Sequence, residues 1–125
     1  MLIVEDDQEM REMLAMTLER AGYEVSAVDS GEWALEVLSG DAHDVVLTDV
    51  RMPGMSGIEL LGRIRDEGIE ATVIVMTAYG TMDLAVEAMK AGAYDYVTKP
   101  FKRDEIRLAL RKAEERERRR REVRR

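Results

Sequence analysis

Short runs of β-branched and aromatic residues alternate along this chain with longer segments of helical periodicity, and this alternation constrains the fold more than any other feature. Five such runs predict β-strands near residues 2–4, 24–28, 45–48, 73–77 and 94–98. A helix-period segment follows each run, and strands that alternate with helices form a parallel sheet covered on both faces. The sequence therefore predicts one α/β domain with a doubly wound (βα)5 sheet.

Signals at the segment ends place the helices. Gly22, Gly68 and Gly92 each follow a periodic segment, where a glycine commonly ends a helix. The stretch "SGIE" at residues 56–59 has the pattern of a capping box. Helices are expected over residues 10–21, over 33–38 with Gly40 as the stop, from 56, over 84–90 and from about 103, the last one burying Ile106, Ala109, Leu110 and Ala113.

The composition of the chain indicates its cellular compartment and the kinds of partner it can bind. The chain has no cysteine, which excludes disulfides, thiolate metal sites and thiol nucleophiles and predicts a cytoplasmic protein. No segment has the form of a secretory signal, and the apolar runs are too short to span a bilayer. The net charge of −7 is unevenly divided, because residues 1–100 hold 20 acids and 7 bases whereas residues 101–125 hold 6 acids and 12 bases. An acidic body suits cations or basic protein surfaces, and only the basic tail could favour nucleic acid.

The polar residues that follow the predicted strands form the candidate site. In doubly wound sheets, ligands bind outside the carboxyl ends of the strands, where the strand order reverses. If the strand order is 2-1-3-4-5, these ends bring together acids, a hydroxyl and an ammonium group from Glu5, Asp6, Asp49, Thr77 and Lys99. Asp49 is the central residue of this set, because it ends the apolar run "VVLT", where an uncompensated charge is costly.

A bound cation would make these acids compatible with one another. Crowded carboxylates repel, and one of them would become neutral unless a cation intervenes. Their hard oxygens suit Mg²⁺, with Asp6, Asp49 and the backbone carbonyl of Arg51 as the candidate ligands. Asp49 could then accept a phosphoryl group, whose charge Lys99 and the Thr77 hydroxyl would stabilise. Asp49 taken alone fits a turn residue or a helix cap better than a phosphoacceptor, so the interpretation depends on the whole set.

Four motifs, "IVEDD", "DVVLTDVRMPGMSG", "VIVMTAYG" and "AGAYDYVTKPF", occur in this order, and together they resemble the receiver domains of two-component response regulators. The resemblance implies a flavodoxin-like fold with the strand order 2-1-3-4-5. It also implies the role of each matched position: Asp49 as phosphoacceptor, Asp6 as direct Mg²⁺ ligand, Glu5 as its indirect acidic neighbour, Thr77 as switch hydroxyl, Lys99 as phosphate-binding lysine and Tyr96 as an aromatic that changes rotamer. Arg51 matches only through its backbone.

The resemblance further implies what the chain does and what it contacts. It is strongest to receivers of the NtrC class, which control enhancer-binding transcription activators. A signalling switch is therefore expected rather than an enzyme, with at most self-phosphorylation from small donors and slow autodephosphorylation. A sensor histidine kinase would supply the phosphoryl group, with Mg²⁺ as cofactor. Phosphorylation would change the face made by the fourth helix, fifth strand and fifth helix and so control homodimerisation or an output domain. Neither membrane contact nor direct nucleic-acid binding is expected.

The domain organisation expected from the sequence has two parts. Residues 1–113 form the receiver domain, and residues 114–125 form a basic helical extension or a linker toward ATPase and DNA-binding output domains outside this chain. The chain would then be a stand-alone receiver or an excised piece. Beyond Ala113 the apolar stripe gives way to Glu117 and Arg120, which favours a solvated helical linker, with nucleic-acid contact and disorder as alternatives.

Other classes of function fit the sequence less well. A dinucleotide-binding enzyme should carry a glycine fingerprint after the first strand, where this chain has acids. Phosphatases that resemble the haloacid-dehalogenase family carry a second acid two residues after the nucleophile, and Arg51 occupies that position here. Tyr96 also fits simple packing, and His43, the single histidine, fits a surface position better than catalysis or metal binding. Glu5 stands where many relatives have aspartate, which keeps the charge and adds a methylene group.

Overall fold

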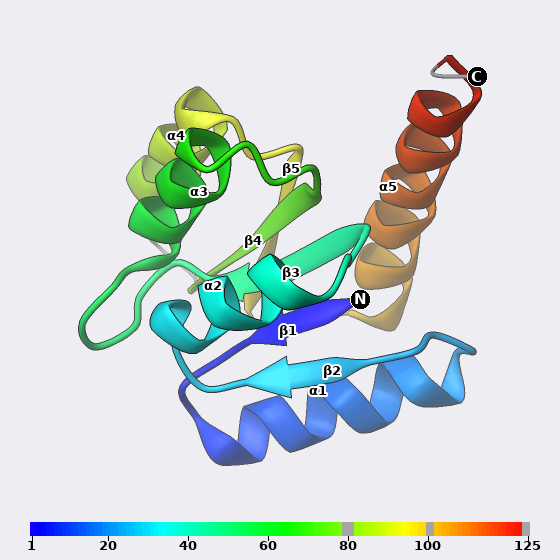
Figure 1. Cartoon of the computed structure of the whole chain (residues 1–125). Coiled ribbons are helices and arrows are strands. Elements are labelled where there is room, and N and C mark those ends of the chain that lie inside the picture. Colours follow the sequence, from blue (N-terminus) through cyan, green and yellow to red (C-terminus); the bar gives the residue numbers. More distant parts are fainter. Residues whose placement is uncertain (79–81, 100–101, 124–125) are drawn as a thin grey trace.

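The computed structural model describes residues 1–78, 82–99 and 102–123, and within those ranges it has five strands and five helices. In chain order these are β1 (Leu2–Val4), α1 (Gln8–Arg20), β2 (Ser26–Val28), α2 (Gly31–Gly40), β3 (Val45–Asp49), α3 (Gly57–Asp66), β4 (Thr72–Ala78), α4 (Met82–Ala91), β5 (Asp95–Lys99) and α5 (Arg103–Val123). All the strands pair in parallel in the order β2-β1-β3-β4-β5 (Figure 1). The predicted (βα)5 alternation and strand order are confirmed.

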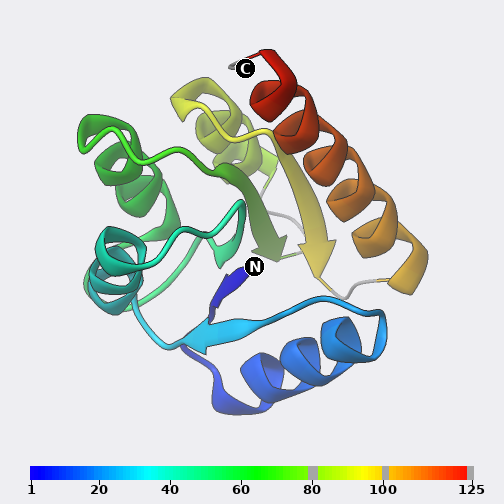
Figure 2. The ribbon, with the colours of Figure 1, turned by 45° about the vertical axis from the view of Figure 1, so that its right-hand side comes forward.

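Both faces of the sheet are covered by helices (Figure 2). Neighbouring residues of a strand point to opposite faces. In β1, Leu2 and Val4 pack in the cluster that contains residues of α2, α3 and α4, whereas Ile3 packs in the cluster that contains residues of α1 and α5. Strand β1 is apolar on both sides for this reason, and the charged side chains of Glu5, Asp49 and Lys99 lie where strands end.

The local signals read from the sequence place the helix ends well. Asp7 precedes α1, and its Oδ1 atom accepts the N–H of Glu9 at 3.0 Å. Ser56 precedes α3, and its Oγ atom accepts the N–H of Glu59 at 3.1 Å, which is one half of the predicted capping box. The three glycines expected after helices all have positive φ, at Gly22, Gly68 and Gly92. Gly40 differs from the expectation, because it is the last residue of α2 and the extended Asp41 ends the helix.

Helix α5 continues without a break past residue 113. The predicted core positions Ile106, Ala109, Leu110 and Ala113 are buried. The buried stripe then continues to Glu117, which is only 6% exposed and accepts a hydrogen bond from the Thr72 hydroxyl at 2.5 Å. This differs from the expected solvated linker, because a polar partner at the start of β4 lets a carboxylate take a core position. The division of the chain at residue 113 stays a prediction.

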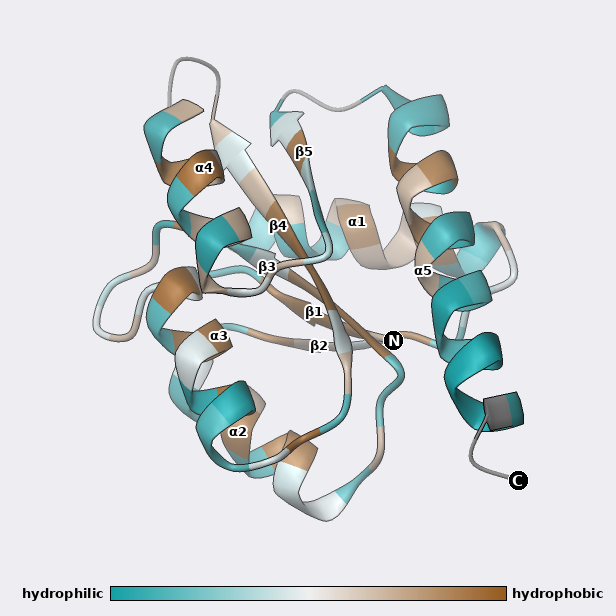
Figure 3. Ribbon diagram, turned by 90° about the horizontal axis from the view of Figure 1, so that it is seen from above, coloured by the Kyte–Doolittle hydropathy of each residue, from teal (hydrophilic) through white to brown (hydrophobic). Residues whose placement is uncertain are grey.

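Hydropathy follows this arrangement of layers. The middle of the sheet is hydrophobic, and the last turns of α5 are mostly hydrophilic (Figure 3). None of the helices in the described ranges is long and apolar enough to cross a lipid bilayer.

Candidate functional site

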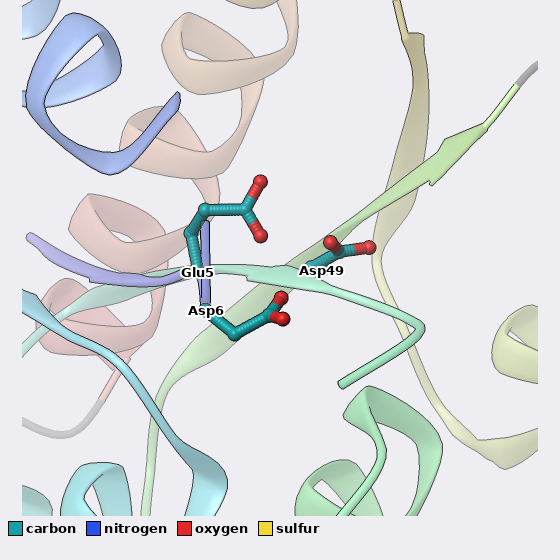
Figure 4. Close-up of side chains that lie close together, drawn as sticks. All are labelled: Glu5, Asp6 and Asp49. Atoms are coloured by element: carbon teal, nitrogen blue, oxygen red, sulfur yellow. The ribbon is translucent and has the colours of Figure 1, made fainter. Parts of the chain in front are cut away.

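The carboxyl ends of β1 and β3 lie side by side and bring three acids together. Val4 at the end of β1 pairs with Thr48 of β3, so Glu5 and Asp6 leave the sheet next to Asp49, the last residue of β3. Each of the three acids offers a carboxylate oxygen, and these oxygens all lie within 4.8 Å of one another (Figure 4). The convergence of the acids expected from the strand order is therefore present.

Lys99 ends β5 and forms ion pairs with two of these acids. Its Nζ atom lies 2.7 Å from Oε1 of Glu5 and 2.9 Å from Oδ2 of Asp49. Burial alone would lower the pKa of the Lys99 ammonium, but the hydrogen bonds and charges of the two carboxylates outweigh it and raise this pKa above its ordinary value. Lys99 is therefore a fixed positive charge at neutral pH.

The carboxyl group of Glu5 lies in an environment that disfavours its charged form. Its side chain is 1% exposed, and burial, together with the neighbouring Asp49 carboxylate, raises its pKa to about 7 even though Lys99 acts in the opposite direction. The Oε2 atom of Glu5 is buried and has no hydrogen-bond partner in the described part of the chain. A buried carboxylate oxygen without a partner requires a cation, a water molecule or a proton.

The loop after β3 is tied closely to the phosphoacceptor candidate. The N–H of Arg51 donates to Oδ1 of Asp49 at 3.3 Å, and the N–H of Gly57 donates to the carbonyl of Val50 at 2.8 Å. A Cβ atom at Gly57 would overlap the carbonyl oxygen of Asp49 and crowd the Cα atom of Val50. The start of α3 is thus packed directly against the backbone that carries the Asp49 carboxylate.

The remaining predicted residues lie on the two neighbouring strands. Thr77 is 4% exposed and follows Met76, the residue that pairs with Asp49 in the β3–β4 ladder. Tyr96 is half-buried on the edge strand β5 and packs against the core cluster of α2, α3 and α4. Pro100, which follows Lys99 in the motif, lies outside the described residues.

Two residues that the sequence analysis did not select also support the site. The Nη1 atom of Arg11 in α1 donates to the carbonyl of Glu5 at 2.9 Å. Oε1 of Glu32 in α2 accepts the N–H of Met55, in the loop after β3, at 3.2 Å. Both side chains bind backbone groups, which no motif of side-chain types can reveal. An arginine one helical turn beyond an acidic loop is the only signal that could have pointed to Arg11.

The donor set fits a hard divalent cation. Glu5, Asp6 and Asp49 supply only oxygen atoms, and one buried oxygen of Glu5 lacks a partner in the described ranges. Mg²⁺ prefers a small number of carboxylates and keeps part of its water shell, which suits a site at an open end of a sheet. The arrangement can therefore hold a cation beside a carboxylate and an ammonium group.

A family model and individual relatives of known function all match this chain to the same family. The family described as "Response regulator receiver domain" matches residues 1–111. FleR, a response regulator protein of Pseudomonas aeruginosa, is 54% identical over 100 residues, which cover 80% of this chain and 21% of FleR. FixJ, a transcriptional regulatory protein of Bradyrhizobium diazoefficiens, is 41% identical, with 90% of this chain and 57% of FixJ covered. The chain thus spans less than two thirds of either relative.

Solved structures agree with these matches. The crystal structure of FixJ-N has a TM-score of 0.87 at 41% identity, with 91% of each chain covered. NtrX from Brucella abortus, crystallised in complex with ADP, has a TM-score of 0.91 at 31% identity, with 98% of this chain but 28% of NtrX covered.

Proposed function

The chain belongs to the response-regulator receiver domain family of two-component signal transduction, and from this premise we propose that it is a switch phosphorylated on Asp49 by a sensor histidine kinase. One observation carries the proposal. The carboxylates of Asp49, Asp6 and Glu5 meet at one end of the sheet, and the Lys99 ammonium lies 2.9 Å from Asp49. This combination provides a nucleophile, a cation site and a fixed positive charge within one cluster.

The reaction follows from these groups. An oxygen of the ionised Asp49 carboxylate attacks the phosphorus atom of a phosphohistidine, the P–N bond breaks, and the leaving imidazole keeps the electron pair and takes up a proton. Asp6, Asp49 and the backbone carbonyl of Arg51 would hold Mg²⁺, with Glu5 in an indirect role. Bound there, Mg²⁺ supplies charge neutralisation for the phosphoryl oxygens. Lys99 is placed to bind a phosphoryl oxygen on Asp49.

The proposed switch connects this reaction to a surface. The new charge on Asp49 draws the Thr77 hydroxyl inward and lets Tyr96 change rotamer. These residues lie on β4 and β5, next to the face made by α4, β5 and α5. That face carries large apolar side chains with at least 40% exposure, namely Met82, Val86, Met89 and Leu108. An exposed apolar surface of this kind favours homodimerisation.

The wider role is proposed from the relatives. Several relatives are named as transcriptional or DNA-binding regulators, so the basic extension over residues 114–125 is proposed as the connection to output domains outside this chain. The chain is proposed to be modified rather than to turn over a substrate, apart from slow loss of its own phosphoryl group. The cytoplasmic location expected from the sequence stays a prediction.

The decisive experiment is phosphorylation by a small donor. The chain is incubated with acetyl phosphate and Mg²⁺ and measured by intact mass. One added phosphoryl group is expected, and it should be absent in Asp49→Ala and when a chelator removes Mg²⁺. Asp66→Ala, which removes an exposed acid at the end of α3, is the matched control and should be phosphorylated normally. Phosphorylation that persists in Asp49→Ala would contradict the proposal.

A further inference from the structure

We infer that Arg11 is a positioning residue for the cation site, because its guanidinium holds the backbone that aims Glu5 and Asp6 at Asp49. The inference rests on the proposed function, since it concerns Mg²⁺ binding at that site. Arg11 acts on the cation site by holding the backbone, and its charge is not what helps the site. It acts through two carbonyl oxygens of the loop between β1 and α1.

The contacts of this loop support a positioning role. Nη1 of Arg11 lies 2.9 Å from the carbonyl oxygen of Glu5 and 3.5 Å from that of Asp6. The N–H of Glu5 donates to the carbonyl of Val28 in β2 at 3.1 Å. The peptide groups on both sides of the Glu5 Cα atom are therefore held, one by β2 and one by Arg11. Fixing both peptide planes fixes the direction in which the side chain leaves the backbone.

The next residue is held in a similar way. Asp6 follows the Glu5 carbonyl, which Arg11 binds, and precedes Asp7, whose side chain caps α1. The carbonyl of Asp6 also lies 3.5 Å from Nη1 of Arg11. The backbone N–H of Arg11 donates to the carbonyl of Asp7 at 2.9 Å, in the first turn of α1. This bond fixes Arg11 close to the loop that its side chain binds. The loop is only three residues long, and each of its backbone carbonyls is bound by a group of Arg11.

Charge alone would make Arg11 unfavourable for this site. A guanidinium near a cation site repels the incoming cation, so deleting its charge should tighten Mg²⁺ binding. Deleting a positioning group should weaken Mg²⁺ binding, because misdirected carboxylates lose affinity. The two interpretations predict changes of opposite sign, and a binding measurement can separate them.

The test compares Arg11→Met, which removes the charge and the donors, with Arg11→Lys, which keeps the charge and one donor group. Mg²⁺ affinity is measured by isothermal titration calorimetry on the full chain. Arg11→Met is expected to bind Mg²⁺ roughly tenfold more weakly than the unaltered chain, and Arg11→Lys to recover most of that loss. Arg20→Met removes the same charge from an exposed position in the last turn of the same helix and should change the affinity less than twofold.

A second measurement separates positioning from general stability. Thermal unfolding is followed with Mg²⁺ and with a chelator. A positioning role predicts that the rise in Tm caused by Mg²⁺ becomes smaller in Arg11→Met. A merely structural role lowers the Tm of the metal-free chain and leaves the Mg²⁺-dependent rise unchanged, which would overturn the inference. If Arg11→Met does not fold, the comparison of Arg11→Lys with the unaltered chain decides, because positioning predicts a two- to threefold weaker affinity there.

The possible failures can be told apart. Equal or tighter Mg²⁺ binding by Arg11→Met, or no recovery in Arg11→Lys, overturns the inference and leaves the proposed function standing if the unaltered chain binds Mg²⁺ and is phosphorylated. A folded, unaltered chain that binds no Mg²⁺ overturns the proposed function and the inference together.

Discussion

Glu5 is the residue whose protonation should most affect stability near neutral pH. Its folded-state pKa is raised to about 7 from an ordinary value of 4.5, so the folded chain holds the Glu5 proton more tightly than the unfolded chain does. The resulting stabilisation is complete below about pH 4.5 and is lost as the pH rises through about 7. The free energy of unfolding of the metal-free chain should therefore fall by at most about 3 kcal/mol between pH 5 and pH 8.

This pH dependence can be measured by urea unfolding in the presence of a chelator. Glu5→Gln should remove most of the fall. Burial lowers the pKa of His43, so that residue contributes a change of opposite sign in part of the range. The chain with Glu5 and the Glu5→Gln variant are therefore compared with His43→Gln present in both. An equal fall with pH in the Glu5→Gln protein would contradict the assignment to Glu5.

Gly57 is predicted to tolerate no side chain. A methyl group there would overlap the carbonyl oxygen of Asp49, so Gly57→Ala should shift the end of β3 or the start of α3 and lower the free energy of unfolding by about 3 kcal/mol. Gly62→Ala is the matched control, because Gly62 lies in the same helix and a Cβ atom there would meet no atom within 4 Å outside the backbone of that helix. It should raise the free energy of unfolding by about 0.5–1 kcal/mol, as measured by chemical denaturation. Two variants of equal stability would contradict the close approach at Gly57.

At this residue scale the site is only partly predictable from the sequence. Asp6, Asp49 and Lys99 could be placed together because strand ends in a parallel sheet meet at one edge. Arg11 and Glu32 could not, since they bind backbone N–H and carbonyl groups that every residue type possesses. The same is true of Gly57, whose importance depends on how closely α3 approaches β3.

At the scale of secondary-structure elements, the second half of α5 is attached to the sheet rather than free. Oε1 of Glu117 accepts hydrogen bonds from Thr72 and from Arg120, the latter at 3.1 Å. Arg121 forms an ion pair with Asp44 at 2.9 Å, although both side chains are mostly exposed and the pair contributes little. The Glu117 contact is therefore a buried polar attachment of this half of the helix, and the Arg116 guanidinium adds a contact 4.9 Å from the centre of the Tyr94 ring.

Glu117→Ala should lower the free energy of unfolding by about 2 kcal/mol, because it leaves the buried Thr72 hydroxyl without its partner. Glu115→Ala, an exposed acid on the same helix, should change it by less than about 0.5 kcal/mol. Urea unfolding measures both. Repeating Glu117→Ala in a Thr72→Val background should cost less, since the partner is already gone. Strictly additive effects would show that the two side chains do not stabilise each other.

Element positions were predicted better than element ends. Strand β1 agrees with its predicted bounds, whereas β2 begins at Ser26 rather than at residue 24 and β4 extends from Thr72 to Ala78 beyond the predicted 73–77. Such ends depend on pairing with a neighbouring strand, which local composition does not encode. Glu117 illustrates the same limit, because its partner lies 45 residues away in the chain.

At the scale of the whole molecule, the phosphoacceptor candidate ends β3, and the proposed dimer face includes β5, two strands away in the same sheet. Val86 and Met89 lie one turn apart on α4 and are 47% and 40% exposed. Val86→Asp should leave phosphorylation from a small donor unchanged and prevent the accompanying dimerisation, because a charge in an apolar interface is costly. Light scattering on the phosphorylated protein measures this. Met16→Asp, a change at a similarly exposed residue of α1, should dimerise normally.

The coupling between site and surface is predicted to pass through Thr77. Its hydroxyl lies on β4 beside the strand that carries Asp49, so it can respond to a phosphoryl group while the Asp49 carboxylate remains able to react without it. Thr77→Ala should therefore be phosphorylated, as intact mass would detect, but should gain at least tenfold less dimer affinity on phosphorylation than the unaltered chain. Thr17→Ala removes a hydroxyl from α1, which packs on the face of the sheet opposite to α4, and should behave like the unaltered chain. Since a receiver can act as a switch only if charge at the strand end changes the energy of a distant surface, equal dimerisation of phosphorylated Thr77→Ala and of the unaltered protein would mean that another element carries the signal.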